Sequence, residues 1–260
     1  MTKVAVVGVV GVGHMGSAII KGLKHNPKNH IIAENLVNPR VSKLAKELEF
    51  ELVNTVADLV EKNPEIVILT TPANITLDLV PELMNLDNDT IILSAAAGIE
   101  YKKIKDILPN HTVARIIPNI PVVINAGTIG LFIPETVDQH KRQFIVDFLS
   151  QLGDVIPVKE DQLSIVGTIG GCGPAFVDVF LDALGDAGVL NGLPRDLTNT
   201  LAASMVKGSA SLAYESKTAP AILRDQVCSP GGTTIQGVAS LEQNGFRYAV
   251  IDAVNKANKN

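Results

Sequence analysis

Runs of apolar, mostly β-branched residues alternate with amphipathic stretches through the first part of the chain. The stretches between the runs carry apolar residues three and four positions apart, which is typical of one helix face. The runs themselves are nearly continuous, which favours parallel strands covered on both faces. The pattern predicts a doubly wound α/β sheet in residues 1–157, closed by a helix in residues 135–153. The six runs are 3–10, 30–37, 66–71, 90–95, 112–117 and 128–133.

Strand-like runs end before residue 158, and the remaining chain has helical spacing. Pro174 opens one long segment, 174–190, because proline is well tolerated in the first turn of a helix. A second segment, 193–216, carries an apolar stripe together with small residues that would let another helix approach closely. We expect an all-helical domain in residues 158–260. The stripe is Leu197, Leu201, Met205 and Leu212, and the small residues are Ala202, Ala203, Gly208 and Ala210.

Composition narrows the classes of partner. The net charge of -5 disfavours nucleic acid and anionic membranes, while a mean hydropathy of +0.26 indicates helix faces buried in an oligomer. Cys172 and Cys228 have no metal-ligand spacing, and so small a cysteine count suits a reducing compartment. Residues 1–10 have the pattern of a strand and not of a signal peptide. The longest uncharged run, 162–177, is broken by glycine and proline, which disfavours a membrane-spanning helix. We therefore expect a cytoplasmic protein with no metal, nucleic-acid or membrane partner.

The stretch GVGHMG forms a GxGxxG motif directly after the first apolar run and before a helical one. In this context the first glycine permits a tight turn, the second lets the backbone approach a pyrophosphate, and the third lets helix and strand pack. The partial positive charge at the helix start favours phosphate. We expect a Rossmann-type domain, with a glycine-rich turn of unrelated purpose as the alternative. The predicted cofactor-binding loop is Gly11, Val12, Gly13, His14, Met15 and Gly16.

The second apolar run bears on the choice of cofactor. An acidic residue at the end of the second strand ordinarily binds the ribose hydroxyls of NAD. If the strand ends at Asn38, no carboxylate repels a 2′-phosphate and Arg40 binds it. If it ends at Glu34, NAD is preferred. We favour NADPH, with Asn38 and Arg40 as cofactor residues and NADH as the alternative; Arg40 as a plain surface charge is the other interpretation.

Two further loops follow the fifth and sixth apolar runs, where strand ends face the ligand crevice of such a sheet. Residues 95–104 supply Ala96, Ala97 and Gly98, and residues 115–127 carry Asn119 between two prolines. The amide of Asn119 both donates and accepts hydrogen bonds, so it suits either a cofactor contact or a structural turn.

The stretch DQVCSPGGTTIQGV, residues 225–238, places a Ser-Pro-Gly-Gly turn before a helical run. Such a turn presents backbone N–H groups at the start of a helix, where a negatively charged group binds well. With its flanks, residues 220–242, it resembles the signature of the pyrroline-5-carboxylate reductase family. The stretches GHMGSAIIKGL, SAAAGI, RIIPNIP and GCGPAFVDVFLDAL match other motifs of that family, in its order and over the whole chain.

The resemblance implies an enzyme that reduces L-1-pyrroline-5-carboxylate to L-proline, the last step of proline biosynthesis. It implies a Rossmann domain joined to a helical dimerisation domain, in homodimers that often assemble into decamers. Hydride passes from the nicotinamide to the imine carbon. A protonated imine is already electrophilic, so positioning is expected to supply most of the rate.

The resemblance also implies roles for residues of the turn. The substrate carboxylate is bound by backbone N–H groups of Gly231, Gly232 and Thr233 with the Ser229 hydroxyl, and Thr234 hydrogen-bonds the ring nitrogen. Asn54, after a short strand, is a further cofactor residue. His14, where the family usually has asparagine, is interpreted as positioning the backbone. The other histidines are expected to be solvated: His25, His30, His111 and His140.

The chain departs from the family pattern outside the turn. Gly170 and Cys172 stand where the family usually has serines, and Thr71-Pro72-Ala73 replaces a lysine-containing run. Ile117 and Ile120 replace the more usual methionine and threonine. Two other interpretations stay open: a reductase of another substrate on this architecture, such as another cyclic imine, and a non-catalytic regulator that senses the cofactor. A β-hydroxyacid enzyme is disfavoured, because 174–188 contains no lysine.

Overall fold

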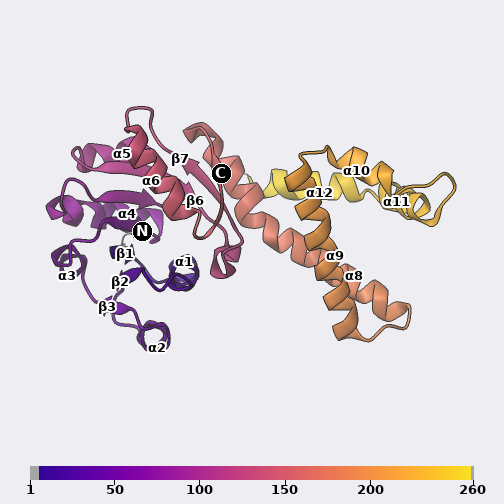
Figure 1. Ribbon diagram of the computed structural model, residues 1–260, viewed down its shortest axis with the longest axis horizontal. Coiled ribbons are helices and arrows are strands. Elements are labelled where there is room, and N and C mark those ends of the chain that lie inside the picture. The colour runs from indigo at the N-terminus through magenta and orange to yellow at the C-terminus, as the bar shows by residue number, and fades with distance from the viewer. Residues whose placement is uncertain (1–5, 259–260) are drawn as a thin grey trace. The chain divides into compact units, whose positions relative to one another are not determined.

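A computed structural model describes residues 6–258, and Figure 1 shows its ribbon. The chain forms two compact units that divide between Gly171 and Cys172. The domain boundary predicted between residues 157 and 158 falls earlier, at the end of the last strand. Each unit is described by itself below.

The first unit is built on one sheet. Within residues 6–258 the strand order is β3-β2-β1-β4-β5-β6-β7-β8, and the order reverses direction between β1 and β4. All neighbours run parallel except β6 and β7, which pair antiparallel, so the expectation of parallel strands is wrong at β7. The strands are β1 Val6–Val10, β2 His30–Glu34, β3 Glu51–Val53, β4 Ile66–Leu69, β5 Ile91–Ser94, β6 Thr112–Ile117, β7 Gly127–Phe132 and β8 Gly153–Pro157.

β8 was not among the predicted strands, because its residues alternate between half-buried and exposed at the edge of the sheet. Gly153 begins this strand, whereas the sequence suggested that it ends the preceding helix. The helical elements of the first unit are α1 His14–Lys24, α2 Pro39–Leu48, α3 Val56–Glu61, α4 Ala73–Leu79, η1 Val80–Asn85, α5 Tyr101–Ile107, η2 Ile120–Ile124, α6 Gln139–Leu149, η3 Glu160–Gln162, α7 Leu163–Gly167 and the first residues of η4 Thr168–Cys172.

Successive side chains of the strands enter two separate hydrophobic clusters, as a sheet covered on both faces requires. Val7 and Val9 pack in one cluster with α1, α2 and α6. Val10 packs in the other, together with residues of α3, η1 and α5. The predicted doubly wound arrangement is therefore present, and it brings the carboxyl ends of β1 and β4 side by side.

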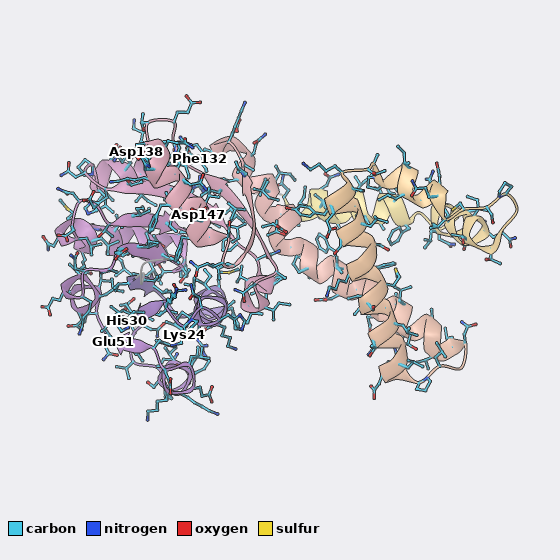
Figure 2. All side chains as sticks on the ribbon, viewed as in Figure 1. Lys24, His30, Glu51, Phe132, Asp138 and Asp147 are labelled. Carbon is cyan, nitrogen blue, oxygen red and sulfur yellow. The ribbon has the colours of Figure 1, made fainter. Side chains whose placement is uncertain are left out.

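The solvated positions predicted for the histidines hold for His25, His30 and His140, which are exposed. The ring of His30 on β2 faces Glu51 on β3, with Nε2 3.7 Å from Oε2, and Figure 2 shows the pair. The prediction is wrong for His111, which is only 3% exposed. Its Nε2 lies 3.3 Å from the carbonyl oxygen of Leu86, the residue that follows η1.

A partly buried ion pair joins β6 to η3. Arg115 on β6 is 7% exposed, and its Nη1 lies 2.9 Å from Glu160 Oε1. The same carboxylate oxygen accepts a hydrogen bond from the Tyr101 backbone N–H at 2.5 Å. Glu160 thus joins β6, the first turn of α5 and η3.

We expect Glu160→Ala to destabilise the protein, because it leaves a buried guanidinium without its carboxylate. Hydrogen bonds to charged groups contribute about 1.5–3 kcal/mol, so the Tm should fall by roughly 4–8 °C for a chain of this size. Thermal unfolding at fixed protein concentration measures the change. Asp161→Ala removes an exposed carboxylate next door and serves as the control. Equal Tm values for the two variants would contradict this role for Glu160.

In the described residues of the second unit every regular element is a helix, as predicted. Its helices are α8 Gly173–Leu190, α9 Arg195–Ser216, α10 Pro220–Gln226, α11 Thr233–Gln243 and α12 Phe246–Ala257. α8 and α9 lie side by side (Figure 1). A Cβ at Gly188 on α8 would lie 2.2 Å from Thr198 Cγ2 on α9, so the closest approach depends on a glycine of α8. Of the small residues predicted on α9, Ala202 is buried and the others are exposed.

One helical run among residues 6–258 is long and apolar enough to cross a membrane, judged by length and composition alone. It is Glu160–Leu190, with a mean hydropathy of 1.5 and 11% of its apolar window buried. The sequence suggested that glycine and proline break this run. The helix instead continues through a π-helical turn, η4, and Pro174 occupies the first turn of α8, where its missing N–H matters least.

Candidate functional site: a dinucleotide pocket and an anion-binding turn

The glycine motif lies at the point where the strand order reverses, between β1 and β4. Gly11 has φ +90, a conformation that residues with a Cβ rarely adopt. A Cβ at Gly16 would lie 2.1 Å from the Gly11 carbonyl oxygen and 2.8 Å from Thr70 Oγ1. A Cβ at Gly13 would have no atom within 4 Å. The motif therefore makes a tight turn, a close helix–strand contact and an open backbone surface at its centre.

A cavity of about 450 Å³ opens over this motif. Its walls come from the glycine loop, the loop between β2 and α2, and the residues that follow β4. Cofactor pockets of open α/β sheets occupy this position, outside the carboxyl ends of the strands. The lining residues are Gly11, Gly13, Glu34, Asn35, Leu36, Val37, Asn38, Thr70, Thr71, Pro72, Ile75 and Leu79.

Three of the predicted cofactor residues line this cavity: Gly11, Gly13 and Asn38. Asn38 also caps α2, since its Oδ1 accepts a hydrogen bond from the Arg40 backbone N–H at 3.0 Å. His14 is exposed at the start of α1, and Met15 is half-buried against the core. Val12 and Gly16, the remaining residues of the motif, are buried.

The loop after β2 is tied to the glycine loop by side chains. Asn35 Oδ1 accepts a hydrogen bond from the Val12 backbone N–H at 2.9 Å. The Arg40 guanidinium donates to the Val12 carbonyl oxygen and, at 3.2 Å, to Ser17 Oγ. These bonds use two of the five N–H donors of a guanidinium. Arg40 therefore lies against the glycine loop with donors left for a phosphate.

β2 ends at Glu34, which is the condition under which the sequence favoured NAD. The Glu34 residue is 6% exposed, and its backbone oxygen accepts a hydrogen bond from Gly11 N–H at 2.9 Å. Burial, and then the charge of Glu82 on η1, raise the pKa of the Glu34 carboxyl, while the Gly11 N–H opposes the shift. The pocket thus contains one buried acid beside the glycine loop.

The raised pKa gives a stability prediction. The folded state holds the Glu34 proton more tightly than the unfolded chain, so stability falls as pH rises from the ordinary carboxyl range through the raised value. Glu34→Gln removes this loss. We expect its Tm to exceed the wild-type Tm by roughly 1–3 °C at pH 8, with the difference shrinking toward pH 5. Thermal melts at the two pH values measure it, and a constant or reversed difference would contradict the prediction.

The other predicted cofactor residues lie outside this cavity. Ala96, Ala97 and Gly98 follow β5, and Gly98 has φ +77. Asn54 is exposed after β3. Asn119 is buried: its Oδ1 accepts from Thr128 N–H at 2.8 Å and its Nδ2 donates to the Gly170 carbonyl oxygen at 2.9 Å.

These bonds give Asn119 the structural role that the sequence had left as an alternative, because its amide already ties together three segments. Its cofactor role stays a prediction, as do those of Asn54 and the loop after β5.

Two threonines of the pocket were missed from the sequence. Thr70 Oγ1 donates to the Gly11 carbonyl oxygen at 2.6 Å, which joins the end of β4 to the glycine turn. Thr71 Oγ1 lies 2.7 Å from Thr76 Oγ1 on α4. Their position at the end of the apolar run 66–71 could have identified them as pocket residues. In a sheet with this strand order the strand of that run, β4, is the neighbour of β1.

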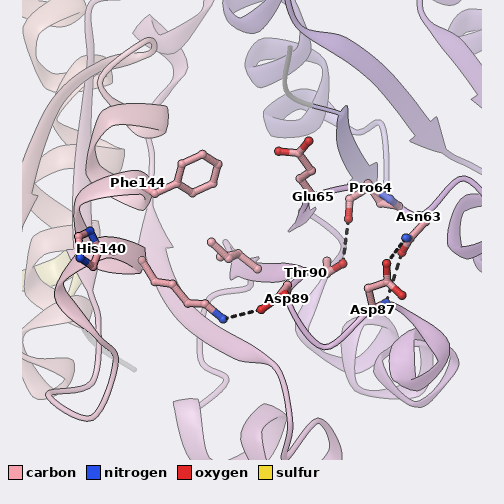
Figure 3. A pocket seen from close by; sticks show the side chains of 10 residues that line it. Asn63, Pro64, Glu65, Asp87, Asp89, Thr90, His140 and Phe144 are labelled. Carbon is pink, nitrogen blue, oxygen red and sulfur yellow. Dashed lines mark hydrogen bonds and ion pairs between the residues drawn. The ribbon is translucent and has the colours of Figure 1, made fainter. Parts of the chain in front are cut away.

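A second cavity, of about 400 Å³, lies at the opposite end of the sheet, before β4 and β5 (Figure 3). Its polar wall residues bond to one another: Lys141 Nζ lies 3.1 Å from Asp89 Oδ1, and Thr90 Oγ1 donates to the Pro64 carbonyl oxygen at 2.9 Å. This cavity is separate from the glycine loop and includes none of the predicted site residues.

In the second unit, residues 229–232 form a tight turn before α11. The Gly232 backbone N–H donates to the Ser229 carbonyl oxygen at 3.0 Å. Gly231 has φ +69, and with Pro230 before it this is the signature of a type II turn. Gly232 is the N-cap of α11, where no side chain caps the helix. A Cβ there would lie 2.3 Å from Ser229 Oγ, so the hydroxyl lies directly over this glycine.

The geometry brings the predicted substrate residues together, although the Gly232 N–H, which was predicted to bind the carboxylate, donates within the turn to the Ser229 carbonyl oxygen. Ser229, Thr233 and Thr234 are exposed around the start of α11, an eleven-residue helix with no acidic residue in its first turn. N–H groups of an uncapped first turn, with the positive end of the helix dipole, form an anion-binding surface. The turn suits a small carboxylate.

The two units together define a class of protein. A doubly wound sheet with a glycine loop at its switch point is a dinucleotide-binding domain, and an all-helical unit follows it. The chain belongs to the pyrroline-5-carboxylate reductase family. It is 33% identical to a pyrroline-5-carboxylate reductase of Treponema pallidum over 259 residues, covering 96% of this chain and 98% of the relative. It is 32% identical to that of Synechocystis sp., covering 96% and 94%.

Two family models and a solved structure agree with this family assignment. Residues 160–260 match the pyrroline-5-carboxylate reductase dimerisation model, and residues 6–98 match an NADP oxidoreductase model described as coenzyme F420-dependent. A Plasmodium falciparum pyrroline carboxylate reductase, crystallised with NADP bound, superposes with a TM-score of 0.85 at 25% identity over 100% of this chain and 97% of that one. The predicted fold class and family resemblance are confirmed.

Proposed function

We propose that this protein reduces L-1-pyrroline-5-carboxylate to L-proline with NADPH, in the last step of proline biosynthesis. The observation that carries the proposal is the uncapped start of α11, where the Ser229 hydroxyl, the glycine turn and Thr234 surround an anion-binding surface. Family membership over nearly the whole chain supports the same reaction, since the relatives are named as reductases of this substrate.

The turn binds and orients the substrate. N–H groups at the start of α11 and the Ser229 hydroxyl receive the carboxylate, each charge-assisted bond contributing about 1.5–3 kcal/mol before desolvation. Thr234, in the first turn of α11, hydrogen-bonds the ring nitrogen. The C=N bond of the protonated imine accepts a hydride at carbon, and the nitrogen keeps its proton as the amine of proline. These residues provide orientation rather than acid–base chemistry.

The pocket of the first unit fits a dinucleotide. Gly13 offers open backbone where a side chain would obstruct a pyrophosphate, and Gly16 lets α1 start against the β1 turn. Arg40 keeps donors available for a 2′-phosphate, and Asn38 lines the wall beside it. When bound, NADPH supplies the hydride. The NADP-bound relative and the NADP oxidoreductase model support this choice.

We further propose a cytoplasmic homodimer formed through the C-terminal helices, with dimers assembling into decamers. The dimerisation model covers these helices. The described residues of the second unit bury little within one chain, and large apolar side chains stay exposed along them. Burying these faces against another copy accounts for the apolar run Glu160–Leu190 without a membrane. Examples are Val179, Leu190, Leu201, Leu212, Ile222, Leu241 and Ile251.

The test is oxidation of NADPH followed at 340 nm with pyrroline-5-carboxylate, beside the six-membered-ring homologue. We expect rapid turnover of the five-membered ring. Turnover of the larger ring alone would assign the protein to another cyclic imine. Absence of turnover by a folded chain that binds NADPH would contradict the proposal and favour a cofactor-sensing regulator.

A further inference from the structure

The long helical run contains a carbonyl group whose usual hydrogen-bond donor is missing. α7, η4 and α8 follow one another without a break from Leu163 to Leu190. In an α-helix the carbonyl oxygen of residue i accepts from the N–H of residue i+4. For Gly170 that residue is Pro174, which has no N–H. At an ordinary helix start no carbonyl precedes the proline at this spacing, but here the preceding turn supplies one.

The side-chain amide of Asn119 supplies the missing donor. Its Nδ2 donates to the Gly170 carbonyl oxygen at 2.9 Å, and its Oδ1 accepts from the Thr128 backbone N–H at 2.8 Å. Because a backbone N–H only donates and a carbonyl oxygen only accepts, these two partners fix which end of the amide faces the helix. Asn119 is 6% exposed, so water does not readily replace it. The side chain therefore takes the place of a helix hydrogen bond.

Side-chain packing contributes little to holding the π-helical turn η4 in place. A Cβ at Gly171 would have no atom within 4 Å, and the nearest atom to a Cβ at Gly170 would be Thr128 Cγ2 at 3.9 Å. Ile169 is 59% exposed. A proline ring also crowds the carbonyl four residues before it, and a π-helical turn departs from the regular α-helical register. The direction of the helical run beyond this turn therefore depends on the amide of Asn119.

Asn119 belongs to the part of the first unit that carries the glycine loop. Pro118 and Pro121 restrict the backbone on either side of it, and η2 follows directly. A Cβ at Gly22 on α1 would lie 2.2 Å from the Val122 carbonyl oxygen of η2, so these two elements are in close contact. α1 begins in the glycine loop. Asn119 thus connects the start of the long run to the elements that surround the dinucleotide pocket.

The dinucleotide pocket and the anion-binding turn lie in different units, which the chain joins between residues 171 and 172. Hydride transfer requires a precise distance between cofactor and substrate, and a misplacement of about 1 Å can lower a rate about 100-fold. We propose that Asn119 is a positioning residue for this transfer: it replaces the N–H that Pro174 lacks and so fixes the direction in which the helical run leaves the sheet. It acts through the Gly170 backbone. The inference rests on the proposed function for the reaction that it affects.

The first test compares Asn119→Ala with Asn29→Ala. Asn29 is also 6% exposed, and its Nδ2 donates to the Leu23 carbonyl oxygen at 2.9 Å, at the end of α1. Both variants lose buried amide bonds, so both should have a lower Tm than wild type. Only Asn119→Ala should lower kcat with pyrroline-5-carboxylate, by roughly 10–100-fold well below both transitions. Its KM for the imine and its Kd for NADPH, from fluorescence titration, should stay within about threefold of wild type.

Pro174→Ala tests the link directly, because alanine restores a backbone N–H four residues after Gly170. In that background Asn119→Ala should lower kcat by less than about threefold. Thr128 loses its acceptor in both backgrounds, so this loss cancels in the comparison. Equal losses of kcat in the two backgrounds would overturn the proposal, as would a wild-type kcat in Asn119→Ala. A raised Kd for NADPH with unchanged kcat would also overturn it and make Asn119 a cofactor ligand.

Thermal melts of the same four proteins separate this proposal from the reductase assignment. Asn119→Ala should lower the Tm less in the Pro174→Ala background than in wild type, whatever the substrate is. Such coupling in a protein that does not reduce pyrroline-5-carboxylate would support the role of Asn119 and reject the reductase assignment alone, whereas equal changes in Tm would overturn the role. If Asn119→Ala did not fold, recovery of folding by Pro174→Ala would support the proposal and its absence would overturn it.

Discussion

A Gly16→Ala chain is expected to lose both thermal stability and affinity for a dinucleotide. The added Cβ would lie 2.1 Å from the Gly11 carbonyl oxygen, which already accepts a hydrogen bond from Thr70 Oγ1. Neither group moves freely, because both belong to the junction of β1 and β4. Overpacking of this kind costs about 1–3 kcal/mol. The Tm should fall by roughly 4–10 °C, and α1 should shift away from the strand ends.

Gly13→Ala is the matched control, because its Cβ would have no atom within 4 Å. Its φ of -74 is also ordinary for alanine. The variant should therefore keep the wild-type Tm while binding NADPH at least about tenfold more weakly, since the Cβ projects from the backbone that a pyrophosphate approaches. Differential scanning fluorimetry and fluorescence titration separate the two effects. Wild-type affinity in Gly13→Ala would show that the phosphates bind elsewhere.

Thr234→Ala is expected to lower kcat with pyrroline-5-carboxylate by roughly 10–100-fold, since one positioning hydrogen bond to the reacting group is lost. Thr234 is exposed in the first turn of α11, so the substitution should leave the Tm nearly unchanged. Steady-state kinetics with both substrates varied measures the effect. Thr234→Ser retains the hydroxyl and should recover most of kcat. If serine and alanine behaved alike, the hydroxyl would have no part in the reaction.

Gly232→Val tests the carboxylate site of the same turn. The Cβ would lie 2.3 Å from Ser229 Oγ and 3.2 Å from the Ser229 carbonyl oxygen. The valine would displace the hydroxyl and cover the first N–H groups of α11, so we expect KM for pyrroline-5-carboxylate to rise beyond measurement. Binding of NADPH, measured separately, should be unaffected. A normal KM would falsify the assignment of the carboxylate to this turn.

Local patterns predicted much of the candidate site because its residues are contiguous. The turn before α11 spans four residues, 229–232, and its chemistry depends on the glycines, the proline and the helix that follows. The glycine loop is likewise a local motif between a strand and a helix. Both appear in the structure as turns before a helix, and Gly11 and Gly231 have the positive φ that glycine adopts easily.

The cofactor pocket was predicted only in part because its walls come from separate segments. Thr70 reaches the glycine turn only because β4 is the neighbour of β1. Arg40 has its place because its guanidinium bonds to Val12 and Ser17, contacts that sequence spacing does not reveal. His111 was predicted to be solvated for a similar reason, since it is buried and contacts the carbonyl oxygen of Leu86, which is distant along the chain.

By itself, the sequence determined the two-part architecture, the glycine loop, the Ser-Pro-Gly-Gly turn before a helix and the family, because each depends on short-range periodicity or on a contiguous motif. The tertiary structure alone decided that β7 runs antiparallel to β6, that β8 completes the sheet, and that β2 ends at Glu34. Strand direction and strand ends are set by hydrogen bonds to neighbours distant in the sequence. The same long-range contacts bury Glu34 in the pocket wall.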